Sequence, residues 1–357
     1  MAGPIRHPIS LPALENFLRA AVPSIQLPLS AQQFGYGQSN PTYLLSSASG
    51  AQYVLRKKPP GQLLSKTAHQ VEREYRVLSA LAGSDVPAPK VYCLCEDTAV
   101  LGSAFYIMEY LDGRIFDDPS LPDVTAEHRA AMWTSAITTL ATLHLIPPAS
   151  NEQLRSFGRP NGFYNRQIKT LSAIEAAQAA TKDVDTQVPV GKIPKFDEMM
   201  RLFSETQPED RSAVVHGDYK IDNLVFHKTE PRVIGILDWE LSTIGHPLSD
   251  LCNLLSPYQF ASPDAAGVSV MGGDPASFLD GATPGLPTRA EAIQLYSQAA
   301  GWTILPSQMF WGDAFGFVRN SVIVQGIAAR FATRQASSEK AGMYAERIPK
   351  IAAIAWK

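Results

Sequence analysis

The block from His216 to Glu240 constrains this chain more than any other part of its sequence. It reads HGDYKIDNLVF and, after a short connection, VIGILDWE. Its two apolar runs predict short strands, and these frame the polar side chains of Asp218, Asn223 and Asp238. Phosphoryl transfer requires a base that accepts a hydroxyl proton and oxygen ligands that hold Mg²⁺ on nucleotide phosphates. Two carboxylates and one amide supply those groups.

The spacing of this block is as informative as its residue types. A kinase catalytic loop has the form H-x-D-x-x-x-x-N, with a metal-binding aspartate one hairpin later, and the chain repeats that order. Turn capping by Asp218 and Asn223 is the ordinary alternative, but it leaves the downstream Ile-Leu-Asp unexplained. We therefore expect Asp218 to act as the base and Asn223 and Asp238 to bind metal. Lys220 is expected to stabilise charge on the transferred group, unless it is a solvent-facing loop lysine.

Length and periodicity predict two lobes. A chain of 357 residues exceeds the size at which a single hydrophobic core usually stops growing. Residues 1–110 predict a small mixed lobe, and 111–357 a larger, mainly helical lobe with the catalytic and metal-binding loops. Residues 257–288, rich in Gly, Pro, Ser and Asp, predict a long surface excursion. Helices are expected near 11–22, 68–81 and 126–145, and strands at 42–46, 52–57, 90–95 and 104–110.

Composition excludes several classes of partner. The net charge of −3 gives no positive field for nucleic acid, and no apolar run approaches the roughly 20 residues that span a bilayer. The N-terminus lacks the apolar region of a signal peptide, so a cytoplasmic protein is expected. Cys93, Cys95 and Cys252 predict reduced, packed thiols. Nothing in the sequence indicates an oligomeric state.

The chain resembles the aminoglycoside phosphotransferase-like kinases, whose catalytic loop reads HGD and continues to an Asn before an I-x-D strand. The resemblance covers nearly the whole chain and implies an α+β, bilobal, protein-kinase-like fold. It also implies ATP and Mg²⁺ as cofactors and a small-molecule hydroxyl as phosphoryl acceptor. The chain is most similar to the kinase-like domain fused to an acyl-CoA dehydrogenase in some eukaryotic proteins. That closer similarity lies in QSNPTYLL, YVLRKKPPG, GRPNGFYNRQI and VIVQGIAARFATRQASSEKA.

The resemblance assigns two segments to nucleotide binding. Residues 34–40 resemble the loop that covers the nucleotide, where glycines admit backbone N–H groups to phosphate oxygens. Ser39 and Asn40 are expected to add side-chain donors there, although a plain hairpin turn is the alternative. The segment YIMEYLDG resembles the hinge, in which the Glu109 carbonyl and the Leu111 amide would bond to adenine.

A strand cation and a helix glutamate usually hold the α- and β-phosphates of the nucleotide. The aligned strand position is Arg56, where the family usually has lysine, and strand alternation favours it over Lys57. Lys57 and Lys58 remain alternatives for the phosphate contact, as does a solvated basic strand edge. The resemblance selects Glu74 over Glu72 as the partner of the cation.

Three further residues of the catalytic region receive supporting roles. His216 is expected to orient the catalytic loop rather than to titrate during the reaction. Asp250, in HPLSDL, resembles the aspartate that braces that loop in the family. Glu240 is expected to contact substrate or metal.

The acceptor is inferred from the closer resemblance, which implies a hydroxyacyl substrate such as a 4-hydroxy acid carried as its coenzyme A thioester. Guanidinium groups suit a carboxylate or the phosphates of coenzyme A. The candidate arginines are Arg166, Arg319, Arg330 and Arg334. Surface ion pairs and helix caps are the ordinary alternatives for them.

Three other functions compete with this hypothesis. A kinase for an antibiotic, amino sugar or other natural product would have the same phosphotransfer residues. A nucleotide-binding pseudokinase that acts as an interaction module is kept open by the arginine at position 56. Protein phosphorylation is less favoured, since no segment resembles an activation loop ending in A-P-E.

Overall fold

The computed structural model describes residues 2–35, 40–59, 70–261, 272–335 and 347–356. These residues form two compact units, neither of which is continuous in sequence. The first unit contains Met1–Ile115, Ala149–Phe157 and Asn223–Ser242, and the second contains Phe116–Pro148, Gly158–Asp222 and Thr243–Lys357. The lobe boundary expected near residue 110 stays a prediction, and each unit is described by itself.

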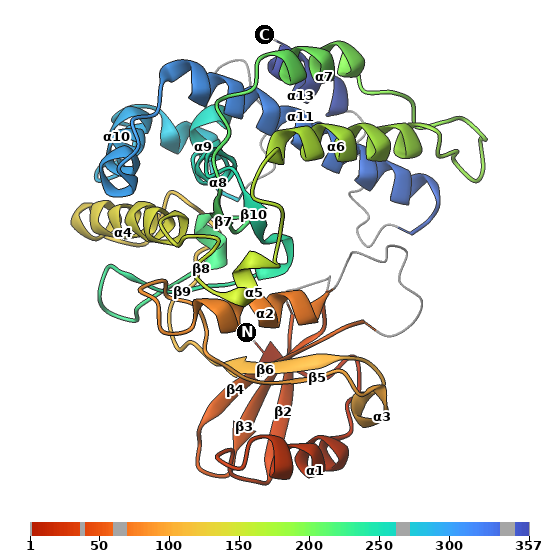
Figure 1. Cartoon of the computed structure of the whole chain (residues 1–357), viewed down its shortest axis with the longest axis vertical. Helices are drawn as coiled ribbons and strands as arrows, with labels where there is room; N and C mark the ends of the chain where they lie inside the picture. The colour runs from red at the N-terminus through yellow and green to blue at the C-terminus, as the bar shows by residue number, and fades with distance from the viewer. Residues whose placement is uncertain (1, 36–39, 60–69, 262–271, 336–346, 357) are drawn as a thin grey trace. The chain divides into compact units, whose positions relative to one another are not determined.

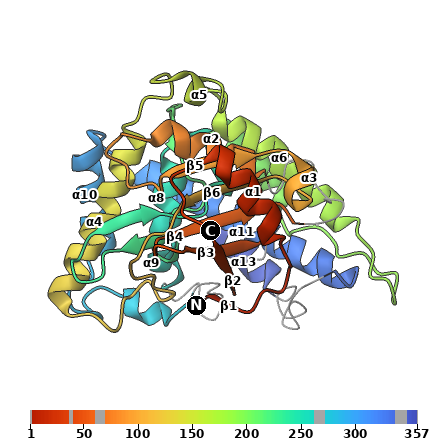
Figure 2. The same ribbon diagram turned by 90° about the horizontal axis from the view of Figure 1, so that it is seen from below.

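An antiparallel sheet of six strands forms the centre of the first unit (Figures 1 and 2), and its strands lie in the order β1-β2-β3-β4-β6-β5. The turn at SASG pairs β3 with β4, so that Thr42 lies opposite Arg56. The four predicted strands are present, whereas β1 and β2 were not predicted. The strands are β1 Ala2–Gly3, β2 Leu29–Phe34, β3 Thr42–Ser47, β4 Gln52–Lys57, β5 Val91–Cys95 and β6 Phe105–Glu109.

Two helices cover opposite faces of this sheet (Figure 1). Helix α1 (Leu11–Ala21) begins at Ser10, whose side chain accepts a hydrogen bond from the Ala13 amide. Its buried Leu14 and Leu18 are four residues apart and pack against Leu45, Leu55, Phe105 and Ile107 of the sheet. Helix α2 (Val71–Leu81) packs against β5 and β6 and carries Glu74 on its buried side.

The remainder of the first unit includes the metal-binding half of the predicted motif. Strands β8 (Leu224–Phe226) and β9 (Val233–Ile236) form the expected antiparallel hairpin, with Leu224 opposite Ile236. The 3-10 helix η2 (Trp239–Leu241) follows, and its residues contact α2. Short helices α3 (Thr98–Leu101) and α5 (Glu152–Arg155) complete the unit.

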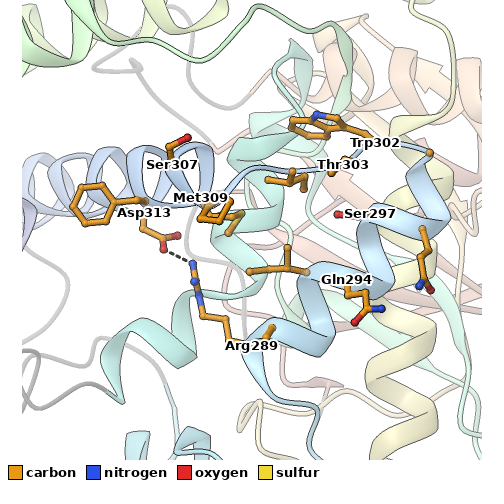
Figure 3. A pocket seen from close by; sticks show the side chains of 15 residues that line it. Arg289, Gln294, Ser297, Trp302, Thr303, Ser307, Met309 and Asp313 are labelled. Carbon is orange, nitrogen blue, oxygen red and sulfur yellow. Dashed lines mark hydrogen bonds and ion pairs between the residues drawn. The ribbon is translucent and has the colours of Figure 1, made fainter.

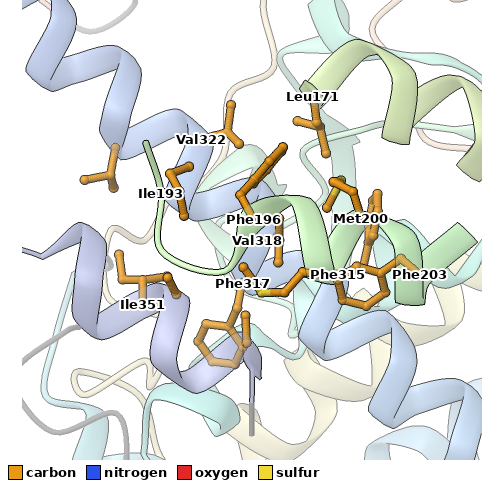
Figure 4. Packing of buried hydrophobic residues seen from close by; sticks show 14 of the residues in the cluster. Leu171, Ile193, Phe196, Met200, Phe203, Phe315, Phe317, Val318, Val322 and Ile351 are labelled. Atoms are coloured by element: carbon orange, nitrogen blue, oxygen red, sulfur yellow. The ribbon is translucent and has the colours of Figure 1, made fainter. Parts of the chain in front are cut away.

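The second unit is mainly helical. Figure 4 shows aromatic and aliphatic side chains of its helices packed together, including Phe196 and Phe203 of α7 and Phe315 and Val318 of α11. The rings of Trp311 and Phe315 stack with their centroids 5.1 Å apart. The long helices are α4 Ala126–His144, α6 Phe163–Ala179, α7 Phe196–Glu205, α10 Arg289–Ala300, α11 Pro306–Ala332 and α13 Ile348–Trp356.

A two-stranded sheet and two short helices position the catalytic loop within the second unit. Strand β7 (Ala213–Val215) pairs with β10 (Thr243–Gly245), a strand that was not predicted. Helices α8 (Leu248–Leu254) and α9 (Ser256–Phe260) follow β10, and the 3-10 helices η1 (Ile221–Asn223) and η4 (Pro275–Phe278) lie on either side in sequence.

The surface excursion expected at 257–288 agrees with residues 272–288, where nearly all side chains are exposed or half-buried, but the segment also buries aromatic rings. Tyr258 and Phe278 are buried, and both rings pack edge-on against the buried Trp133. A segment rich in Gly and Pro can therefore contribute to a core, because its few aromatic residues find partners on a distant helix.

Two further expectations concern the cysteines and membranes. Cys93, Cys95 and Cys252 are free and buried, as expected. Among the helical residues that the structure describes, no helix has both the length and the apolar character needed to cross a bilayer.

Candidate active site

The catalytic loop follows β7, a strand of three buried residues. His216 is fully buried, and its Nδ1 accepts a hydrogen bond from the Asp218 amide at 3.2 Å. Gly217 has φ 85°, a left-handed conformation that glycine adopts without steric cost. The loop therefore bends between a buried histidine and the aspartate that is predicted to be the base.

Asp250 contacts the backbone of this loop from α8. Its Oδ2 accepts from the His216 amide at 2.6 Å and its Oδ1 from the Gly217 amide at 2.8 Å. His144 Nε2 lies 3.3 Å from Oδ2, and His144 Nδ1 lies 2.6 Å from the Tyr296 hydroxyl. Because a carboxylate only accepts, Nε2 donates, and in the neutral ring Nδ1 accepts from Tyr296. This geometry suits the bracing role predicted for Asp250.

Asp218 contacts Asn253 and Lys220 within the second unit. Asn253 Nδ2 donates to Asp218 Oδ1 at 3.4 Å and to the Tyr219 carbonyl at 3.1 Å. Lys220 Nζ lies 3.5 Å from Asp218 Oδ2 and 3.1 Å from Asp222 Oδ2. Burial opposes the charge of Lys220, but the two carboxylates raise its pKa overall. A charged lysine beside the predicted base suits stabilisation of a transferred phosphoryl group.

Arg319 of α11 also contacts the catalytic loop. Its Nη2 donates to the Gly217 carbonyl at 2.8 Å. Among the four arginines predicted to bind the acceptor, Arg319 is therefore the one that the structure connects to the residue beside Asp218.

Arg166, Arg330 and Arg334 have other surroundings. Arg166 donates to the backbone carbonyls of Asn161, Arg159 and Ile244, which ties its guanidinium to the segments around α6 and β10. Arg334 pairs with Asp183 and Asp185 at the protein surface. Arg330 is exposed in the last turn of α11. For Arg166 and Arg334 these contacts agree with the ordinary alternative, in which an arginine has a structural role and does not bind the acceptor.

Asn223 and Asp238 lie together in the first unit, at the ends of the β8–β9 hairpin. The Leu237 amide donates to the Asn223 carbonyl at 2.8 Å, which fixes the two residues' backbones next to each other. Asp238 has φ 64°, a left-handed conformation that aspartate tolerates better than most residues.

The donor set of this hairpin fits Mg²⁺, because a carboxylate and an amide oxygen are hard oxygen ligands. Across the residues that the structure describes, no group of three or more His, Cys, Asp and Glu side chains is placed to hold a metal ion. Mg²⁺ commonly binds through one or two carboxylates plus substrate phosphates. Asp238 and Asn223 would therefore hold the metal together with nucleotide oxygens.

Arg56 on β4 faces three carboxyl groups of the first unit. Its Nε lies 2.9 Å from Glu74 Oε2, and its Nη2 lies 2.6 Å from Asp238 Oδ1 and 3.5 Å from Glu240 Oε2. Burial opposes the charge of Arg56, but Glu74 and Asp238 raise its pKa above the ordinary value. Burial raises the pKa of Glu74 to about 7 despite the guanidinium.

Glu74 also accepts two hydrogen bonds from other side chains. Tyr106 donates its hydroxyl proton to Oε2 at 2.9 Å, and Asn40 donates from Nδ2 to Oε1 at 3.0 Å. Asn40 is buried and its side chain contacts Glu74; the nucleotide contact expected of it stays a prediction. Ser39 lies outside the described residues.

Neither alternative lysine takes the place of Arg56. Lys57 is 8% exposed, and strand alternation puts it on the sheet face opposite to Arg56. Lys58 pairs with Glu72, which also removes Glu72 as an alternative to Glu74.

The predicted hinge residues belong to the end of β6 and the segment after it. Glu109 accepts a hydrogen bond from the Lys90 amide through Oε2 at 3.2 Å. The Leu111 side chain fills the space beside Gly235, where a Cβ atom would overlap it. The backbone roles predicted for Glu109 and Leu111 stay predictions.

A separate pocket lies between α10 and the start of α11 (Figure 3) and has a volume of about 1130 Å³. Ile293, Trp302 and Met309 contribute apolar walls, and Arg289 and Asp313 form an ion pair at one end. None of the side chains that line it belongs to the predicted phosphotransfer set.

Several contacts were missed from the sequence. Asn253 follows Asp250 by three residues, so both lie on one face of α8, and this spacing was the available signal. The partners Tyr106, His144 and Tyr296 are distant in sequence from the residues they bind, and no local pattern indicates them.

Comparison with known proteins decides the family. The sequence profile of the "Phosphotransferase enzyme family" matches residues 30–276, well over half of the chain. The chain belongs to this family. The prediction of a phosphotransferase with an alcohol group as acceptor is thus confirmed at the level of the family.

Curated relatives of this phosphotransferase are longer proteins. It is 36% identical over 354 residues to "Acyl-CoA dehydrogenase family member 11" of Gallus gallus, a match that covers 97% of this chain and 43% of that protein. It is 35% identical over 360 residues to "Acyl-CoA dehydrogenase family member 10" of Mus musculus, covering 99% and 32%. The chain therefore spans less than half the length of these relatives.

Solved structures share the fold of this phosphotransferase. A crystal structure described as a "putative aminoglycoside phosphotransferase" from Ralstonia eutropha is 36% identical, has a TM-score of 0.81 and covers 98% of each chain. The GDP complex of wild-type aminoglycoside 2'-phosphotransferase-IIIa has a TM-score of 0.61 at 16% identity, covering 96% and 99%. At that identity the likeness concerns the fold alone. The predicted α+β, protein-kinase-like fold is confirmed.

Proposed function

We propose that this chain is an ATP- and Mg²⁺-dependent small-molecule kinase that transfers the γ-phosphoryl group to a substrate hydroxyl. The observation that carries the proposal is the intact catalytic loop, in which Asp218 is positioned by a buried histidine and bordered by Lys220. A pseudokinase is less well supported, since it would have no need for this arrangement.

In the proposed reaction Asp218 accepts the proton of the acceptor hydroxyl, either fully or by orienting it for attack. Lys220 stabilises negative charge as the phosphoryl group is transferred. Asn253 holds the Asp218 carboxylate through Oδ1 at 3.4 Å, and Lys220 lies 3.5 Å from Oδ2.

The first unit supplies the proposed nucleotide contacts. Arg56 holds α- and β-phosphate oxygens, and Glu74 fixes the orientation of its guanidinium through Nε at 2.9 Å. Asp238 and Asn223 hold Mg²⁺, which supplies charge neutralisation on the phosphates. The backbone groups of Glu109 and Leu111 bind the nucleotide base.

For the acceptor we propose a hydroxy acid or its coenzyme A thioester. The relatives that match nearly the whole chain are named as acyl-CoA dehydrogenase family members, which supports an acyl substrate. Arg319, bonded to the Gly217 carbonyl, is the candidate acceptor arginine that contacts the catalytic loop, and its charge would attract an anionic acceptor. A polycationic acceptor would be repelled by it.

An amino-sugar or antibiotic acceptor is the second candidate. The structure with a TM-score of 0.81 is described as a "putative aminoglycoside phosphotransferase". Aminoglycosides are therefore included among the acceptors to be tested.

The deciding experiment measures ADP release by the purified chain with four acceptor sets. These are hydroxy acids, their coenzyme A thioesters, aminoglycosides with other amino sugars, and short amino alcohols, each with Asp218→Asn as the matched control. Acceptor-dependent ADP release with an acyl compound, lost in Asp218→Asn, is the expected result. Preference for a polycationic sugar would replace the acyl assignment, and nucleotide binding without turnover on any set would favour the pseudokinase.

A further inference from the structure

Arg56 is the cation that contacts the predicted metal-binding carboxylate. Its Nη2 lies 2.6 Å from Asp238 Oδ1 and 3.5 Å from Glu240 Oε2, all within the first unit. The Asp238 side chain is 37% exposed, whereas that of Arg56 is 12% exposed. The position that a metal ion would take beside Asp238 therefore borders a guanidinium group.

The two ends of this guanidinium differ in how firmly they are held. Nε pairs with Glu74, which is 1% exposed and also accepts hydrogen bonds from Tyr106 and Asn40. This end is anchored, because Glu74 is buried and is itself held by two hydrogen bonds from other side chains. Nη2 instead contacts the more exposed Asp238 and Glu240, so this end can exchange one anion for another.

An arginine can pair with Glu74 at one end of its guanidinium and with Asp238 at the other, whereas the lysine usual in the family could not. A guanidinium presents Nε and Nη2 as separate donors in a fixed plane, so it bridges Glu74 and Asp238 at once. An ammonium group is a single point of charge on a flexible stem and cannot span two carboxylates with the same geometry.

We propose that Arg56 is the resident counter-ion of Asp238 and Glu240 and keeps divalent metal from this site until a nucleotide arrives. The inference rests on the proposed function, because Asp238 must be a metal ligand. Nucleotide phosphates provide Nη2 with an alternative anion and provide the metal with oxygen ligands in addition to those of Asp238 and Asn223. Metal and nucleotide therefore bind with positive coupling.

The test uses Mn²⁺ as the metal probe and ADP as the nucleotide, with the full chain. Electron paramagnetic resonance of free Mn²⁺ and calorimetry measure Mn²⁺ affinity without nucleotide, and calorimetry measures ADP affinity. The variants are Arg56→Gln and Arg56→Lys. Lys228→Gln is the matched control, because it removes a lysine whose exposed ion pair with Asp112 lies on the surface of the same unit.

The two affinities are expected to move in opposite directions. Arg56→Gln should bind Mn²⁺ alone about tenfold or more tightly than wild type, because a positive charge beside the carboxylates is gone. The same variant should bind ADP about tenfold or more weakly, because a phosphate contact is lost. Arg56→Lys should fall between wild type and Arg56→Gln in both measurements, and Lys228→Gln should match wild type.

Other outcomes separate the inference from the proposed function. If Arg56→Gln loses ADP affinity while its Mn²⁺ affinity stays the same or falls, Arg56 is only a phosphate ligand and the counter-ion role is refuted. The counter-ion role is also refuted if the tighter Mn²⁺ binding of Arg56→Gln persists after Asp238→Asn is added. If Arg56→Gln does not fold, the same comparison is made with Arg56→Lys. Failure of the wild type to bind ADP would instead refute the kinase proposal.

Discussion

Replacement of the buried Asp250 by asparagine tests how the catalytic loop is held. The carboxylate accepts from the His216 and Gly217 amides at 2.6 and 2.8 Å, one with each oxygen. Asparagine has a single oxygen, and its NH₂ group would face an N–H donor in place of an acceptor. One of the two loop amides must therefore lose its partner, and the other exchanges a charged acceptor for a neutral one.

The expected cost follows from these two changes. A hydrogen bond to a charged group contributes about 1.5–3 kcal/mol, and a buried donor left without a partner costs about 1–3 kcal/mol. We expect Asp250→Asn to lower the free energy of unfolding by about 3–5 kcal/mol at pH 7, measured by urea denaturation. Asp185→Asn is the control, because it removes a carboxylate from an exposed surface pair with Arg334 and should change stability little.

The pH dependence provides an independent check. Burial opposes ionisation of Asp250, but His144, His216 and the loop amide hold its pKa below the ordinary value of 3.8. A carboxyl group with a lowered folded-state pKa contributes stability above its unfolded pKa, and this is lost as pH falls through the folded pKa. The difference between wild type and Asp250→Asn should thus be constant from neutral pH down to about 5 and shrink below about 4. A difference independent of pH, or one below about 1 kcal/mol at pH 7, would refute the bracing role.

Four further predictions concern the proposed reaction and its scaffold. Asp218→Asn should keep ADP affinity but lower turnover by about 10²–10⁴-fold, and wild-type turnover would exclude it as the base. Asp238→Ala should abolish metal-dependent nucleotide binding in calorimetry and Asn223→Ala should weaken it, whereas unchanged affinity in Asp238→Ala would remove that residue from the metal site. Arg319→Ala should raise the KM of an anionic acceptor about tenfold more than that of a neutral one, and an equal effect on both would contradict a charge role. Gly235→Ala should destabilise folding by about 1–3 kcal/mol because its Cβ overlaps Leu111, and an unchanged urea midpoint would show that Leu111 repacks.

The sequence predicted those parts of the fold in which local pattern and tertiary contact agree. Helix α1 was visible because Leu14 and Leu18 recur at helical spacing and are both buried against the sheet. The β8–β9 hairpin was visible because its two apolar runs enclose a short connection. In each case neighbours in the chain are also neighbours in the core.

The elements that were missed depend on partners elsewhere. Strand β2, LSAQQF, alternates only weakly between apolar and polar residues, and it is defined by pairing with β1 and β3. Strand β10 has three residues and exists because it pairs with β7. The composition of 257–288 predicts exposure, but the aromatic residues of this segment pack on Trp133, which lies on a helix far away in sequence.

The same distinction separates the phosphotransfer residues from the acceptor residues. Phosphoryl transfer needs a base and metal ligands at fixed positions along one loop and one hairpin. Spacing along the chain is therefore enough to predict Asp218, Asn223 and Asp238. An acceptor site has no such spacing, because whether an arginine lies beside the catalytic loop depends on tertiary contacts. Arg166 donates to three backbone carbonyls and Arg334 pairs with two aspartates, and neither partner set could be read from spacing. Of the arginines predicted to bind the acceptor, Arg319 contacts the catalytic loop, where its Nη2 donates to the Gly217 carbonyl, so its substitution is the test of the acyl hypothesis.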